Sequence, residues 1–292
     1  MVIYVKNNKI EKAIETINTE KLDVYGLEIY NNFNLIYQHF WKDDIKYPIY
    51  SATKSFTSTI IGIAWDAKKI SIDSPITNYF DEAIIKKIDQ NKLSILRNIT
   101  IENLLTMSVK GYSFRPFGGD WLISALNSSI CYESNTVGYY SNIPAYITGV
   151  ICENAVGMPL IDFSGEYLFK RLDCPIPIYQ TDPSGRFYGA TGFKMRLSDF
   201  SKLGLLWLNN GLYNNNKILS AEWIEKSIIP HTIIKSEKYG YYVWVNDNYY
   251  HFKGKWGQNC IVVPRENIVV TYLANVKEQT HHLQEIVLDS LI

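Results

Sequence analysis

Strand-like segments lie at both ends of this 292-residue sequence, and helix-like segments fill the middle. Asn31-Asn32 separates the first two strand-like runs, which is a hairpin signal. Because short turns make consecutive strands antiparallel, the simplest fold joins both ends of the chain in one antiparallel sheet. The expected strands are residues 24–30, 33–40, 239–245, 249–253, 259–263 and 268–273.

The segments between these ends carry helical spacing of apolar residues and helix caps. Thr100, Ser198 and Ser220 are the expected caps. The expected helices include residues 9–19, 51–69, 144–156, 200–208, 222–228 and 283–291. We therefore predict one α+β domain. Residues 1–74 and 231–292 form an α/β lobe with the antiparallel sheet, and residues 75–230 form an inserted, mostly helical lobe. A cleft between the lobes is the expected place for a site.

Composition excludes several classes of function. The 29 Lys and Arg residues balance the 29 Asp and Glu residues, and no basic stripe is visible, so nucleic acid is a poor candidate partner. No apolar run reaches the length needed to cross a bilayer, and residues 1–10 lack the apolar core of a secretory signal. We expect no membrane contact and a cytoplasmic protein.

Cysteine and histidine spacing predicts neither a disulfide framework nor a metal site, and no cofactor is expected. The four cysteines show no C-x-x-C pair, so buried reduced thiols are expected. The five histidines show no H-x-x-x-H or H-E-x-x-H pattern. The residues concerned are Cys131, Cys152, Cys174, Cys260, His39, His231, His251, His281 and His282.

The first candidate catalytic residues lie at the start of the most apolar predicted helix. Ser51 and Lys54 form the only S-x-x-K pattern and lie on one face, one turn apart. Burial depresses the pKa of a lysine, so its neutral amine can accept a serine proton. The alternative is an N-cap serine beside a solvated lysine.

Two further segments suit such a site. Tyr140 and Asn142 follow the polar loop 133–138 and lead into an apolar helix, and a tyrosine whose pKa is lowered by nearby cations can carry a proton to a leaving group. The alternative is a core tyrosine bonded to a backbone carbonyl. Residues 253–258 lie between two predicted strands and could supply an oxyanion-binding N–H group, or could be a hairpin turn only.

Together these motifs resemble the serine β-lactamase-related family, which includes class C β-lactamases, penicillin-binding proteins and 6-aminohexanoate-dimer hydrolase-type esterases. The resemblance covers nearly the whole chain. It rests on the order and spacing of Ser51-Ala-Thr-Lys54-Ser55, residues 99–107, Tyr140-Ser141-Asn142, residues 254–258 and residues 261–266.

The resemblance implies a β-lactamase/transpeptidase-like fold and a role for each site residue. Ser51 is then the nucleophile, Lys54 its base and Tyr140 the proton shuttle, while Asn142 bonds Lys54 or a substrate amide. The backbone N–H of Lys255, beside Gly254 and Trp256, completes the oxyanion hole.

The sequence departs from this family by lacking S-D-N and K-T-G. Y-S-N in place of S-D-N is similar to the class C branch. Residues 252–254 are the preferred match to K-T-G, and residues 255–257 are the alternative register. Without K-T-G the hydroxyl and cation that grip a penicillin carboxylate are missing, although Lys255 or Arg186 could bind an acid group.

We therefore expect a serine acyl hydrolase for a small ester or amide, more an esterase or amidase than an efficient β-lactamase. A ligand-binding or regulatory protein of the same fold is the alternative, and it requires the Lys54 amine to lie in solvent. An exported cell-wall peptidase is a third possibility.

Overall fold

The computed structural model describes residues 8–132 and 136–291, so part of loop 133–138 and most of residues 1–10 lie outside it. The helices, including short 3-10 and π turns (η), are α1 (Asn8–Thr19), η1 (Tyr50–Ala52), α2 (Thr53–Asp66), η2 (Ile76–Tyr79), α3 (Glu82–Ile85), α4 (Gln90–Leu96), α5 (Ile101–Leu105), α6 (Trp121–Leu126), α7 (Ile143–Val156), α8 (Leu160–Ser164), η3 (Gly165–Phe169), α9 (Leu197–Leu208), α10 (Ala221–Ile228), η4 (Pro264–Glu266) and α11 (Thr280–Asp289). The strands are β1 (Val24–Asn31), β2 (Asn34–Phe40), β3 (Tyr47–Pro48), β4 (Val109–Lys110), β5 (Cys131–Tyr132), β6 (Lys194–Met195), β7 (Leu212–Tyr213), β8 (Asn216–Lys217), β9 (Thr232–Ile234), β10 (Glu237–Tyr239), β11 (Trp244–Val245), β12 (Tyr250–Gly254), β13 (Gln258–Val263) and β14 (Ile268–Ala274).

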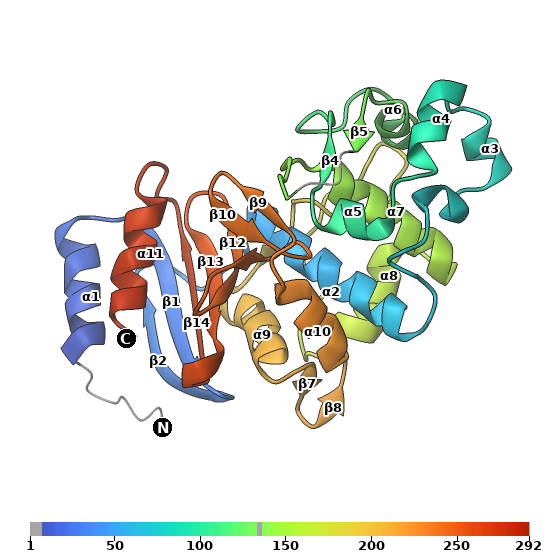
Figure 1. The fold of residues 1–292 in the computed structure, drawn as a ribbon. Coiled ribbons are helices and arrows are strands. Elements are labelled where there is room, and N and C mark those ends of the chain that lie inside the picture. The colour runs from blue at the N-terminus through green and yellow to red at the C-terminus, as the bar shows by residue number, and fades with distance from the viewer. Residues whose placement is uncertain (1–7, 133–135, 292) are drawn as a thin grey trace.

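An eight-stranded antiparallel sheet joins the two ends of the chain, as predicted. Its order is β2-β1-β14-β13-β12-β11-β10-β9, so the N-terminal hairpin pairs with the last strand. Helices α1 and α11 cover one face of the sheet, whereas α9 and α10 lie on the other side, towards α2 and the helical part of the molecule (Figure 1). The fold is therefore α+β, and its helices flank an antiparallel sheet.

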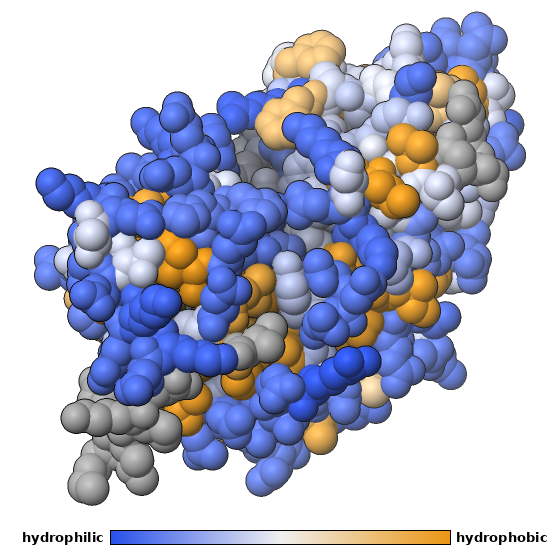
Figure 2. Space-filling model, turned by 60° about the vertical axis from the view of Figure 1, so that its left-hand side comes forward, coloured by the Kyte–Doolittle hydropathy of each residue, from blue (hydrophilic) through white to orange (hydrophobic). Residues whose placement is uncertain are grey.

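Two hydrophobic cores hold these layers together. The smaller core lies between the sheet and the pair α1 and α11, and includes Ile17, Ile29 and Leu283. The larger core extends from the opposite sheet face through α9 and α2 to α7. On the face drawn in the space-filling view, hydrophilic residues predominate and groups of hydrophobic residues lie between them (Figure 2).

The lobe boundaries at residues 75 and 230 stay a prediction. Helix α9 lies within that range, and it packs on β13 and β14 of the sheet.

The predicted strand 239–245 is wrong, because the chain turns back within it. Strand β10 ends at Tyr239 and β11 begins at Trp244. A Cβ on Gly240 would come 1.9 Å from the carbonyl oxygen of Ser227, and Tyr242 has a left-handed φ of 57°. The buried tyrosines of this turn gave it the apolar character of a strand.

Two smaller expectations also need correction. Helix α9 begins at Leu197, so Ser198 lies inside the helix, and no side chain caps its start. Cys131 is exposed, while the other three cysteines are buried as expected. By contrast, Ser220 accepts a hydrogen bond from the N–H of Trp223 and caps α10 as predicted. Within residues 8–132 and 136–291, no helix is both long and apolar enough to span a membrane.

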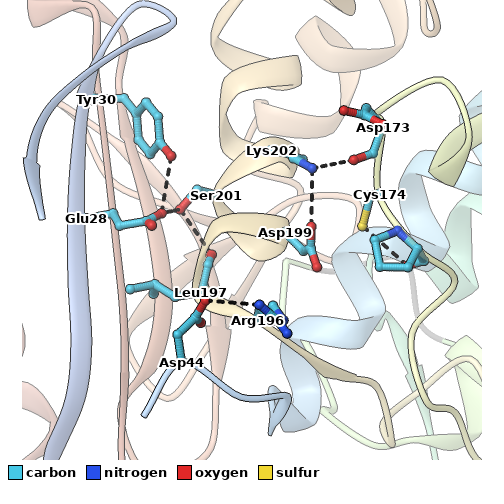
Figure 3. A network of polar contacts seen from close by, with 11 residues as sticks. Glu28, Tyr30, Asp44, Asp173, Cys174, Arg196, Leu197, Asp199, Ser201 and Lys202 are labelled. Atoms are coloured by element: carbon cyan, nitrogen blue, oxygen red, sulfur yellow. Dashed lines mark hydrogen bonds and ion pairs between the residues drawn. The ribbon is translucent and has the colours of Figure 1, made fainter. Parts of the chain in front are cut away.

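A buried carboxyl connects β1 of the sheet to α9 (Figure 3). Glu28 is 0% exposed and accepts hydrogen bonds from Ser201 Oγ at 2.8 Å and Gln38 Nε2 at 2.7 Å. Tyr30 Oη donates to the same carboxyl at 3.3 Å. Burial raises the pKa of Glu28, and these donors act in the opposite direction. The network fixes α9 on the sheet through the hydrogen bond from Ser201 to the Glu28 carboxyl.

Candidate active site

Ser51 lies in a tight turn that leads directly into the buried helix α2. The chain enters through β3, which pairs with β6, and the N–H of Ile49 donates to the carbonyl of Phe193 at 3.0 Å. Tyr50 then adopts φ 47°, a left-handed conformation that costs a non-glycine residue energy. Two contacts hold it there: Thr53 Oγ1 donates to its carbonyl at 2.7 Å, and Trp256 meets its ring edge-on at 5.2 Å.

The neighbouring lysine is buried, and the hydrogen-bond partners of its amine within residues 8–132 and 136–291 are neutral. Lys54 is 1% exposed, and its Nζ donates to Asn142 Oδ1 at 2.7 Å and to the carbonyl of Ala190 at 2.9 Å. The same nitrogen lies 3.3 Å from Ser51 Oγ. Burial lowers the pKa of Lys54 to about 7. The alternative of a solvated lysine is therefore wrong, and a neutral amine with its lone pair towards Ser51 is accessible near neutral pH.

Tyr140 contacts both Ser51 and Lys54. Its hydroxyl hydrogen-bonds with Ser51, and its ring centroid lies 4.9 Å from Lys54 Nζ. Burial raises the pKa of Tyr140 to about 12, although the bond to Ser51 acts against this rise. The expectation that nearby cations lower this pKa is wrong, because burial is the largest influence on Tyr140 and raises its pKa. Tyr140 is thus a protonated donor at neutral pH.

Asn142, at the start of α7, is fixed from three directions. Its Oδ1 accepts from Lys54, its Nδ2 donates to Tyr188 Oη at 3.1 Å, and its backbone N–H donates to the carbonyl of Phe114 at 2.9 Å. The side chain is 3% exposed. The amide oxygen therefore points at the lysine amine, which is the first of the two roles expected for Asn142.

The end of β12 lies against the entry to the Ser51 turn. A Cβ on Gly254 would come 2.1 Å from the carbonyl oxygen of Ile49, so only glycine fits there. Gly254 is the last residue of β12, and Lys255 and Trp256 follow in the turn before β13. The match of residues 252–254 to K-T-G stays a prediction. The position of the Lys255 N–H in an oxyanion hole stays a prediction.

Comparison with known families agrees with this geometry. The family model described as Beta-lactamase matches residues 35–288. The chain belongs to the β-lactamase family. Membership in this family makes it a serine hydrolase and confirms the resemblance drawn from the sequence. A search of the curated proteins found no match.

Several solved structures share the fold of this β-lactamase family chain. A penicillin-binding protein homologue from Caulobacter crescentus has TM-score 0.77 and 11% identity, covering 100% of this chain and 99% of its own. A family VIII carboxylesterase has TM-score 0.76 and 12% identity, with coverages of 100% and 99%. A protein assigned as a 6-aminohexanoate-dimer hydrolase from Bacillus anthracis has TM-score 0.73 and 17% identity, with coverages of 94% and 80%.

Sequence reasoning missed two contributors to the site of this β-lactamase family member. The carbonyl of Ala190 accepts from Lys54, and Tyr188 Oη accepts from Asn142. Tyr188 stood out only as an aromatic residue, and a backbone carbonyl has no sequence signature. The one available signal was Gly189, whose φ of 69° and close approach to the carbonyl of Ala145 (3.0 Å from an added Cβ) suit glycine.

Arg186 is removed from the candidate groups for binding a substrate acid. It forms ion pairs with Glu153 at 3.7 Å and with Asp182 at 3.8 Å. Asp182 in turn accepts a hydrogen bond from Tyr146 Oη at 2.6 Å, so this arginine belongs to a separate structural network.

Proposed function

We propose that this protein hydrolyses small esters or amides through an acyl-enzyme on Ser51. The observation that carries the proposal is the buried Lys54 amine, 3.3 Å from Ser51 Oγ and with a pKa of about 7. A hydroxyl beside a neutral amine in a dry site is the arrangement that activates a serine nucleophile.

The reaction proceeds in two balanced halves. Ser51 Oγ attacks the carbonyl carbon and its proton passes to Lys54 Nζ. Backbone N–H groups of Ser51 and Lys255 stabilise the oxyanion. Tyr140 Oη then gives its proton to the leaving oxygen or nitrogen as the acyl–leaving-group bond breaks, and Lys54 returns a proton to Tyr140. Water attacks the acyl-enzyme with the same groups in reverse.

An esterase or amidase fits this site better than an efficient β-lactamase. The K-T-G position holds Phe252, which is fully buried with its ring 5.1 Å from Trp207, followed by Lys253 in an ion pair with Glu237. Neither offers the hydroxyl and free cation expected to grip a lactam carboxylate. The alternative of a non-catalytic binding protein loses support, because Lys54 is buried beside Ser51.

A substrate panel with matched serine variants tests the proposal. The panel contains 4-nitrophenyl acetate and butyrate, a D-amino-acid anilide, and nitrocefin. Ser51→Ala should lose ester hydrolysis. Ser58→Ala, in α2, should keep it, because Ser58 Oγ is buried and has no hydrogen-bond partner among the described residues. Ester hydrolysis that survives in Ser51→Ala contradicts the proposal. Nitrocefin turnover as fast as that of the esters contradicts the preference for esters and amides over β-lactams.

A further inference from the structure

The ion pair between Lys253 and Glu237, on strands β12 and β10, has no role in the proposed reaction. Lys253 Nζ lies 2.9 Å and 3.1 Å from the two carboxylate oxygens of Glu237. Lys253 is the penultimate residue of β12 and Glu237 is the first residue of β10. The two side chains are 30% and 44% exposed, so a ligand can reach them.

Two independent contacts connect this pair to the reacting groups. The first runs through aromatic rings: Lys253 Nζ lies 5.2 Å from the Trp244 ring centroid, and Trp244 stacks on Tyr140 at 5.6 Å with an interplanar angle of 29°. The second runs along the backbone, because Lys253 directly precedes Gly254, which abuts Ile49. Lys253 thus contacts the ring that stacks on Tyr140, the tyrosine assigned to the leaving group, and Glu237 is its ion-pair partner.

The charge of Glu237 determines whether the Lys253 ammonium can attract an anionic leaving group. An unpaired ammonium beside Trp244 would attract a leaving group that carries a carboxylate, but Glu237 neutralises that ammonium and adds its own repulsion. Two other ammonium groups, of Lys255 and Lys277, lie over the Trp256 ring, 4.0 Å and 5.4 Å from its centroid. Of these three lysines, Lys253 alone contacts the ring that stacks on Tyr140.

We propose that Glu237 is a specificity-determining residue that makes the enzyme prefer esters and amides with neutral leaving groups over those with anionic ones. The inference rests on the proposed hydrolase function and adds the charge class of the substrate. Because the ion pair is partly exposed, its effect is modest and is screened by salt.

One matched substrate pair measures this preference. Phenyl acetate and 3-acetoxybenzoate carry the same acetyl group, and their leaving groups differ by one carboxylate. The quantity compared is the ratio of kcat/KM for 3-acetoxybenzoate to that for phenyl acetate. In Glu237→Gln this ratio should rise about fivefold over wild type, the size expected for a partly exposed charge pair. The rise should shrink in 0.5 M salt.

Two control variants separate this effect from a general change of charge. Asp247→Asn removes the same charge from the neighbouring pair Lys238–Asp247, whose carboxylate is 80% exposed, and should leave the ratio within about twofold. Glu237→Gln combined with Lys253→Met should abolish the gain, because the gain requires the free ammonium.

The outcomes distinguish this inference from the function on which it rests. Phenyl acetate hydrolysis that depends on Ser51, with an equal ratio in Glu237→Gln and Asp247→Asn, overturns the role of Glu237 and leaves the hydrolase intact. A gain that persists in the double variant also overturns it. If wild type hydrolyses neither ester, the proposed ester hydrolysis fails and this inference falls with it.

Discussion

Lys54 Nζ donates to Asn142 Oδ1 at 2.7 Å, although 88 residues separate the two in the sequence. The partner is a neutral amide, and the second acceptor is the carbonyl of Ala190. A carboxylate in either place would hold the proton on the lysine, whereas amide and carbonyl dipoles orient the amine and let burial lower its pKa. Asn142 therefore positions the Lys54 amine without favouring its charged form.

The activity should follow the titration of Lys54. We expect kcat/KM to rise about tenfold per pH unit in the acid range and to level off above about pH 7, where the amine is neutral. Ionisation of Tyr140 should not lower kcat/KM between pH 5 and 9, because the pKa of Tyr140 is raised to about 12. Initial rates with an uncharged ester from pH 5 to 9 test this. A profile flat through pH 7 contradicts Lys54 as the base.

Asn142→Asp should keep Lys54 protonated at neutral pH, so that it cannot act as a base. A carboxylate at the Oδ1 position favours the charged amine, so the acid limb should move about 1–3 units to higher pH. Rates at pH 9 should recover relative to those at pH 7. The pH profile and the melting temperature are to be measured together. An unmoved limb in a folded variant would show that Asn142 does not control Lys54.

The sequence made the helical face of Ser51 and Lys54 visible, because apolar residues at three- and four-residue steps predicted a buried helix. Turn residues likewise predicted β12, β13 and β14. The tertiary partners were out of reach: the Ala190 carbonyl, the bond from Asn142 to Tyr188 and the pair of Glu237 with Lys253 depend on how distant segments meet. The split between β10 and β11 was missed because buried tyrosines at a turn have the same composition as a strand.

Gly254 gives a test of the contact between β12 and the Ser51 turn. In Gly254→Ala the new Cβ would come 2.1 Å from the Ile49 carbonyl oxygen, so the strand must move. A displacement of about 1 Å at a reacting centre can cost about 100-fold in rate, which is the loss we expect in kcat/KM. Gly119→Ala is the matched control, because an added Cβ meets nothing within 4 Å there. Wild-type activity in Gly254→Ala would refute this placement.

Glu28 should make the stability depend on pH in a predictable direction. Burial raises its pKa in the folded protein above the ordinary value of 4.5, so the folded state holds the proton more tightly than the unfolded state. This carboxyl therefore lowers the free energy of unfolding as pH rises from about 4.5 through its folded pKa.

Glu28→Gln removes that dependence. Relative to wild type, the variant should gain stability as pH is raised from 4 to 7. Urea denaturation at both pH values gives the difference. A gain that is the same at pH 4 and pH 7 would mean that Glu28 titrates normally in the folded state.

The central claim, that Ser51 is a nucleophile activated by a neutral Lys54, is tested most directly by covalent labelling with a fluorophosphonate. Intact-mass measurement and peptide mapping should find one adduct, on Ser51, in wild type and in Ser58→Ala, and none in Ser51→Ala. The labelling rate should rise towards pH 7 and then level off. An adduct that persists in Ser51→Ala, or that maps to another residue, would contradict the account.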